Sequence, residues 1–335
     1  MKRILTGDNT TGKLHLGHYV GSLENRVKLQ DEYETFIVLA DMHSFAYPKY
    51  VENPEVINAS AKEVLLDNLA VGLNPDNVTF FPESAVPEIY ELATILSMLV
   101  THNRALRNPT IKEEIKDKNL GDNYSLGFIN FPLLQVADIL SVQADLVPVG
   151  EDQLPHLELT NEVVRRFNQV YGNTLKEIEG KVGRVKRLVG IDGNVKMTKS
   201  LNNAIYLSDF AQEVEKKVMS MYTDPTRIHP TDPGHIEGNP VFIYLDAFGT
   251  EEDNAQINEY KNRYMIGKVR DIEVKKYLAQ VLNNFLDPIR KRRVQFESQP
   301  GLVKKILKEG TQKTRAEAQK TLEEVKKAMK LNYFE

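Results

Sequence analysis

The chain has 335 residues, of which 41% are hydrophobic, and a formal net charge of −4. At roughly 150 residues per domain, this length predicts a large domain and a smaller one. The chain has no cysteine, which excludes disulfides, thiolate zinc sites and a cysteine nucleophile, and makes a reducing cytoplasm the expected location. No stretch approaches the roughly 18 apolar residues of a membrane span, so no membrane association is expected.

The charge is distributed unevenly along the chain. Residues 286–335 hold 13 Lys and Arg against 7 Asp and Glu, so the rest of the chain is acidic. This asymmetry is compatible with a nucleic-acid partner at the C-terminal end, and equally with solvated faces of amphipathic helices.

The first half of the sequence alternates strand and helix patterns. Apolar runs at 3–6, 35–41 and 78–84 predict strands, and residues 53–73 show apolar side chains at helical spacing. Such alternation favours a parallel sheet with crossover helices, hence an α/β fold.

Helical patterns dominate between about 86 and 143, and the runs 145–150 and 184–190 predict two further strands. We therefore expect one domain over 1–205 with a helical insertion at about 86–143. The remainder, 206–335, reads as a mainly helical region whose last helix could pack back on the first domain.

The stretch HLGH places two histidines where a helical pattern begins. His15 and His18 flank the expected helix start near Gly17, where free amides and the positive end of the helix dipole gather. A helix start after a strand and a glycine-containing loop suits phosphate oxygens, and imidazoles add further donors. The alternative is one packed and one solvated histidine.

A second motif, KMTKS, begins 178 residues after His18 and follows the last predicted strand. Lys196 and Lys199 on such a loop could neutralise a triphosphate and its departing pyrophosphate. The alternative is a solvated basic loop. The order of the two motifs along the chain favours a shared phosphate site.

The two motifs resemble the HIGH and KMSKS signatures of class I aminoacyl-tRNA synthetases. The stretches GHYVGSLENRV, FPLLQVADIL and VPVGEDQLPHLELTNEVVRRFN are similar to those of bacterial-type tryptophanyl-tRNA synthetases. The resemblance covers most of the chain. It implies a homodimer with a Rossmann-like catalytic domain, a helical anticodon-binding region, the use of ATP and Mg²⁺, and L-tryptophan and tRNA(Trp) as substrates.

The resemblance also assigns residues to ATP. They are Gly7, Asn9, His15, Gly17, His18, Gly150, Asp152, Gln153, Lys196, Met197, Lys199 and Ser200. Lys112 aligns less closely with a phosphate-binding lysine of the family, and its alternative is an exposed lysine in a charged segment.

Asp138 is the residue that bears on the choice of amino acid. Its neighbours in QVADIL are apolar, so its carboxylate is expected to be buried and to need a partner. Indole offers one donor and no acceptor, which suits a carboxylate; a backbone amide or a lysine is the alternative partner. The same pocket is expected to include Leu5, His43, Phe131, Gln135, Val147 and Val149, although core packing explains the apolar ones equally well, and His43 could instead cap a helix.

Two features depart from the tryptophanyl pattern. Asn9 in TGDNTTG stands where a Gln-Pro pair is common, and Gln135 stands where methionine is usual. The spacing of Gln135 and Asp138 resembles tyrosyl-tRNA synthetases, but RILTGDN lacks the tyrosine with which that family grips a phenol. Tryptophan is therefore the expected substrate and tyrosine the alternative.

Two other classes remain open on the motifs alone: a small-molecule nucleotidyltransferase, which shares the His-x-Gly-His site, and a noncatalytic nucleotide or RNA sensor. The other histidines show no metal-ligand spacing, so we expect no structural zinc and no metal held by side chains.

Overall fold

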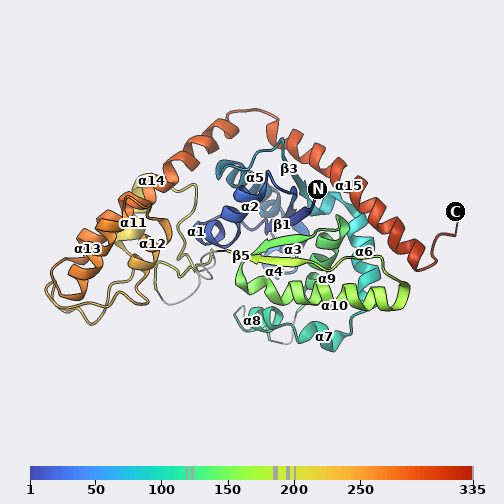
Figure 1. Ribbon diagram of the computed structural model, residues 1–335, viewed down its shortest axis with the longest axis horizontal. Coiled ribbons are helices and arrows are strands. Elements are labelled where there is room, and N and C mark those ends of the chain that lie inside the picture. Colours follow the sequence, from blue (N-terminus) through green and yellow to red (C-terminus); the bar gives the residue numbers. More distant parts are fainter. Residues whose placement is uncertain (118–119, 122–123, 184–187, 194–196, 200, 334–335) are drawn as a thin grey trace.

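The computed structural model describes residues 1–117, 120–121, 124–183, 188–193, 197–199 and 201–333. Its centre is a five-stranded, wholly parallel sheet in the order β3-β2-β1-β4-β5 (Figure 1). The strands are β1 (Arg3–Asn9), β2 (Glu34–Ala40), β3 (Val78–Pro82), β4 (Leu146–Val149) and β5 (Glu179–Val182). The predicted α/β class with a parallel sheet is confirmed.

The fifth strand does not lie where the sequence predicted it. β5 is formed by Glu179–Val182, which pair in register with β4, whereas the prediction was 184–190. Residues 184–187 lie outside the described residues, and 188–190 are not part of the sheet. β5 is an edge strand with three exposed residues, so its pairing with β4 decides its conformation and no apolar run marks it.

Helices cover both faces of the sheet, and β2 shows why. Ile37 and Leu39 belong to one buried cluster, and Phe36 and Val38 belong to another, because successive side chains of a strand point to opposite faces. The helices that follow the strands are α1 (Leu16–His18), α2 (Glu24–Leu29), α3 (Asp41–Ser44), α4 (Pro48–Val51), α5 (Pro54–Ala70), α6 (Pro87–Ser97), α7 (His102–Leu106), α8 (Pro109–Asp117), α9 (Leu126–Ser141) and α10 (Leu154–Tyr171). A sheet covered in this way is open only at its edges and strand ends.

The chain beyond the sheet is helical, with α11 (Ala211–Met219), α12 (Pro240–Phe248), α13 (Asn254–Met265), α14 (Asp271–Glu297) and α15 (Leu302–Ala328). α14 packs on α11 and α12 and then on α5, and α15 turns back over β3, α6 and α9 (Figure 1). A side chain on Gly310 of α15 would meet the carbonyl oxygen of Phe80 in β3, so this contact requires glycine. The second half of the helical region therefore rests on the sheet domain.

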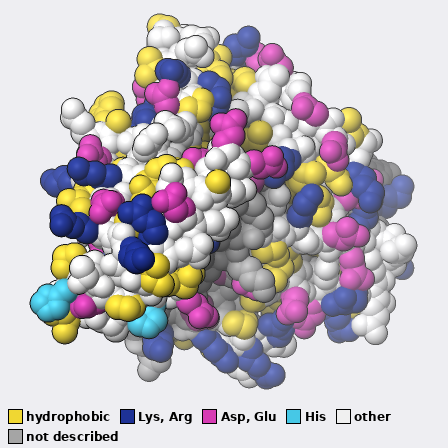
Figure 2. Space-filling model, turned by 60° about the vertical axis from the view of Figure 1, so that its left-hand side comes forward, with side chains coloured by type: hydrophobic (Ala, Val, Ile, Leu, Met, Phe, Trp, Pro, Cys, Tyr) yellow, Lys and Arg dark blue, Asp and Glu magenta, His cyan; other side chains and the backbone are white. Residues whose placement is uncertain are grey.

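The surface over the helical region carries Lys and Arg side chains interspersed with Asp and Glu (Figure 2). Among the described residues, no helix combines the length and the apolar character needed to cross a membrane.

Candidate functional site

The two signature motifs meet through a short antiparallel pairing. The Leu16 amide donates to the Ile205 carbonyl and the Leu207 amide to the Leu14 carbonyl, each over 3.0 Å. His15 therefore lies opposite Tyr206 as a bridge partner. The loop after β1 and the segment that follows KMTKS are thus held side by side.

Lys199 reaches directly into the β1 loop. Its Nζ donates to the Gly12 carbonyl over 2.7 Å. Burial lowers the pKa of Lys199 to about 8, although the nearby carboxylates of Asp8 and Asp67 favour its charged form. Anionic oxygens placed beside Lys199 would favour the ammonium further, as a triphosphate would.

The rings of the two histidines are in contact at the start of the helix, with centroids 3.8 Å apart and ring planes tilted by 46°. The His15 amide donates to His18 Nδ1 over 3.1 Å. Because Nδ1 accepts this bond, a neutral His18 ring carries its proton on Nε2, where it can donate to an oxygen of a ligand. A side chain at Gly17 would come within 3.0 Å of the His15 ring, so glycine leaves this surface open.

A buried ion pair lies beneath the same loop. Arg26 donates to both carboxylate oxygens of Asp8 and to the Gly7 carbonyl, and Asn68 donates to Asp8 as well. Burial alone raises the pKa of Asp8, but the charge and hydrogen bonds of Arg26 outweigh burial and hold it below its usual range. This network was not predicted, because its members are far apart along the chain and no local pattern links them.

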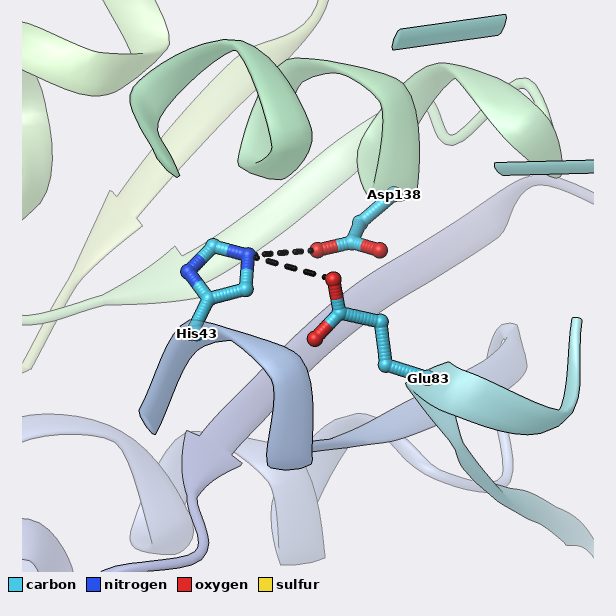
Figure 3. A group of neighbouring side chains, drawn as sticks. All are labelled: His43, Glu83 and Asp138. Atoms are coloured by element: carbon cyan, nitrogen blue, oxygen red, sulfur yellow. Dashed lines mark hydrogen bonds and ion pairs between the residues drawn. The ribbon is translucent and has the colours of Figure 1, made fainter. Parts of the chain in front are cut away.

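Three buried titratable side chains meet at the ends of neighbouring elements (Figure 3). His43 follows β2, Glu83 follows β3, and Asp138 comes from α9. His43 Nε2 lies 3.2 Å from Asp138 Oδ2 and 3.5 Å from Glu83 Oε1. Asp138 Oδ1 and both carboxyl oxygens of Glu83 are buried without a hydrogen-bond partner. Such acceptors are costly unless a donor or a proton reaches them.

Burial is the main cause of the unusual acidities in this cluster. It raises the pKa of Asp138 well above its usual range, with Asp41 adding to the effect. It also raises the pKa of Glu83 to about 8; His43 opposes this and Asp138 reinforces it. Within the described part of the chain, this trio is the set of potential metal-ligating side chains whose ligand atoms all lie within 4.8 Å of one another. Glu83 was not predicted, because it reads as an ordinary polar residue at the end of a strand.

The aromatic wall expected from the sequence is beside this cluster. The Phe131 ring lies 6.0 Å from the His43 ring and 5.7 Å from the His156 ring, measured between centroids. Burial lowers the pKa of His156 to about 4, so that ring is neutral at pH 7. Gln135 donates to Gln153 Oε1 over 3.3 Å, which joins α9 to the turn after β4.

The other residues predicted for the site lie in the core of the sheet domain, at its surface or outside the described residues. Leu5, Val147 and Val149 belong to a buried core cluster of the sheet. Gly7 leaves room for Val38 of β2, Asn9 and Asp152 are exposed, and Gly150 packs against the Asp152 side chain. Met197 is buried behind Gly17, and Lys112 is exposed on α8. Lys196 and Ser200 lie outside the described residues.

The loop after β1 that carries His15 and His18 (the histidine loop) and the cluster of His43, Glu83 and Asp138 lie at the same edge of the sheet. β1, β2 and β3 are parallel and in register, so the segments carrying His15, His43 and Glu83 all leave the carboxyl ends of their strands. This edge is where parallel α/β sheets bind ligands. The fold thus defines an α/β protein of the doubly wound class.

Comparison with known proteins narrows this class. The family model for class I tRNA synthetases of the tryptophan and tyrosine group matches residues 1–287, and the chain belongs to that family. A tryptophan–tRNA ligase of Streptococcus pyogenes serotype M1 is 50% identical over 337 aligned positions, which cover 99% of this chain and 98% of that protein. One of Streptococcus pneumoniae, strain TIGR4, is 49% identical with the same coverage.

Solved structures agree with this assignment. The Campylobacter jejuni tryptophanyl-tRNA synthetase complexed with ADP and tryptophan has a TM-score of 0.83 and 27% identity, covering 98% of this chain and 99% of that one. The Mycoplasma pneumoniae tryptophanyl-tRNA synthetase has a TM-score of 0.82 and 26% identity, with coverage of 99% and 98%. The family resemblance stated from the sequence is confirmed.

Proposed function

We propose that this protein activates L-tryptophan with ATP to tryptophanyl-adenylate and transfers the tryptophanyl group to tRNA(Trp). The observation that carries the proposal is the unpartnered Asp138 Oδ1, buried beside Phe131 at the sheet edge that also carries the histidine loop. An indole N–H supplies the one donor that this oxygen needs. The names of the Streptococcus relatives support the same substrate.

The chemistry needs positioning and charge stabilisation more than a protein nucleophile. The tryptophan carboxylate attacks the α-phosphorus of ATP, a new P–O bond forms, and pyrophosphate leaves. In this proposal His18 Nε2 and Lys199 donate to phosphate oxygens whose negative charge grows in the transition state, and the contact of Lys199 with the loop after β1 supports that role. The 3′-terminal ribose hydroxyl of tRNA then attacks the adenylate carbonyl, and AMP leaves.

ATP enters as its Mg²⁺ complex in this scheme. The carboxylates nearest the histidine loop are already engaged, Asp8 by Arg26 and Asp67 by Arg293 and the Leu14 amide. Mg²⁺ therefore takes its ligands from phosphate oxygens and water, as it usually does with nucleotides. The ATP contacts assigned from the resemblance remain part of this proposal.

We also infer a homodimer with a cytoplasmic location. Leu126 is an exposed apolar side chain that lines a groove between α6, α7 and α9, within the predicted helical insertion, and Met98 directly after α6 is exposed as well. Exposed apolar surface of this kind suits a subunit interface. The location follows from the tRNA partner and from the absence of cysteine in the sequence.

Tyrosine is the alternative amino acid. It is favoured by the Gln135 and Asp138 pair, but the Gln135 amide donates to Gln153, and Leu5 stands in β1. A phenol presents an oxygen that both donates and accepts, whereas Asp138 Oδ1 needs only a donor. This balance supports tryptophan.

Amino-acid-dependent exchange of pyrophosphate into ATP tests the proposal. We expect exchange with tryptophan and at least about a hundredfold less with tyrosine at equal concentration, because a buried polar group left unpaired strongly disfavours the wrong ligand. Charging of tRNA(Trp) with labelled tryptophan tests the second step. Exchange with tyrosine and not with tryptophan would identify tyrosine as the substrate. If no amino acid supported exchange, the proposal would be contradicted.

A further inference from the structure

The loop that carries the histidines is held from two sides. On one side it pairs with the segment after KMTKS, through the Leu14 carbonyl and the Leu207 amide. On the other side the Leu14 amide donates to Asp67 Oδ2 over 2.7 Å, and Asp67 is fully buried on α5. Asp67 thus fixes the backbone of the residue that immediately precedes His15.

Asp67 is in turn held by the helical region. Arg293, near the end of α14, donates through Nη1 to Asp67 Oδ1 and through Nη2 to Glu63 Oε2 over 2.7 Å. Its Nε lies 2.9 Å from Glu297 Oε1 on its own helix, and its side chain is almost wholly buried. The guanidinium is therefore gripped by three carboxylates, with Asp67 and Glu63 one turn apart on α5.

The charge balance around Asp67 depends on this arginine. Burial raises the pKa of Asp67 to about 6, whereas the charge of Arg293 and the Leu14 amide favour the ionised form. Asp67 also favours the charged form of Lys199, whose Nζ bonds the Gly12 carbonyl of the same loop. Loss of Arg293 would leave the buried carboxylate of Asp67 without its counter-ion beside the histidine loop.

We propose that Arg293 and Asp67 are positioning residues that couple α14 to the histidine loop. Through them, the packing of α14 on α5 sets the positions of His15 and Lys199. α14 packs on α11 and α12 as well as on α5, so the Arg293–Asp67 pair transmits a displacement of α14 to the loop. This inference rests on the proposed function, in which that loop binds ATP.

Tryptophan-dependent pyrophosphate exchange with the full-length protein tests the coupling. Arg293→Gln is expected to lower kcat/KM for ATP by roughly tenfold or more, because a hydrogen bond between charged groups is lost, while the KM for tryptophan changes less than about twofold. A purely structural role would move both substrates together or neither.

The matched control is Arg227→Gln in the helical region. Arg227 is also a buried arginine, with its Nη1 3.0 Å from Asp271 Oδ2, and its other hydrogen bonds go to backbone carbonyls within residues 230–269. It is expected to lower the melting temperature without a selective change in the KM for ATP.

The double variant Asp67→Asn with Arg293→Gln keeps the test decisive if Arg293→Gln folds poorly. The asparagine oxygen still accepts a hydrogen bond from the Leu14 amide, and no unpaired buried charge remains. The kcat/KM for ATP should therefore return to within about threefold of the wild-type value. A folded Arg293→Gln protein with unchanged ATP kinetics, or a double variant that is no better than the single one, would overturn the inference. Absence of exchange in the wild-type protein would instead contradict the proposed function.

Discussion

The site has a nucleotide end, at the histidine loop, and an amino-acid end, at the cluster of His43, Glu83 and Asp138. Both lie at the carboxyl ends of the parallel strands, but they present opposite hydrogen-bonding groups. The nucleotide end presents donors and positive charge, from His18, from Lys199 and from the helix start at Gly17. At the amino-acid end, Asp138 presents a buried oxygen that has no donor. Donors without acceptors suit an anion, and acceptors without donors suit a neutral ring with one N–H. The contrast predicts that damage at each end affects one substrate and spares the other.

Removal of Lys199 is expected to have the largest effect. Lys199→Ala should lower kcat/KM for ATP in tryptophan-dependent exchange by about a hundredfold, because a donor to developing phosphate charge is lost. The KM for tryptophan should change little. Lys62→Ala, at an exposed lysine on α5, is the control. A change of less than threefold in kcat/KM for ATP would show that Lys199 does not stabilise the phosphates.

Removal of Asp138 is expected to have the next largest effect, on the other substrate. Asp138→Ala should raise the KM for tryptophan or lower kcat/KM by about tenfold or more, since a buried indole N–H left without an acceptor costs roughly 1 to 3 kcal/mol. The KM for ATP should stay near its wild-type value. Asp76→Ala, at an exposed aspartate, should leave both unchanged. Equal losses for ATP and tryptophan would break the division between the two ends.

The effect of Glu83 should appear in the pH dependence of stability. Burial raises its pKa from 4.5 to about 8. The stability that its bound proton contributes is therefore complete below pH 4.5 and declines as the pH rises to about 8, at up to about 1.4 kcal/mol per pH unit. Glu83→Gln removes this titration, so its melting temperature relative to wild type should rise between pH 5 and 8. Glu52→Gln, at an exposed glutamate, should show no such trend.

The parts of this molecule that the sequence predicts are those with a local signal. Four strands are marked by apolar runs, and the order of HLGH and KMTKS predicts their convergence. β5 carries no such run, because an edge strand is exposed on most of its residues. Its position depends on pairing with β4, which no local pattern encodes.

The same limit applies to the site. Asp138 stands out because a carboxylate among apolar neighbours needs a partner. Glu83 does not, since its surroundings come from α3 and α9, which are distant in the sequence and bring His43 and Asp138 beside it. Arg293 and Asp67 are 226 positions apart, and either one alone resembles an ordinary charged residue on an amphipathic helix.

Binding of tryptophan itself tests the central claim most directly, and the chain is well suited to it because it contains no tryptophan residue. Indole fluorescence in a titration therefore reports only the ligand. We predict saturable binding at one site per chain in the wild-type protein and in Lys199→Ala, and binding weakened by about tenfold or more in Asp138→Ala. Wild-type affinity in Asp138→Ala, or loss of tryptophan binding in Lys199→Ala, would contradict the account.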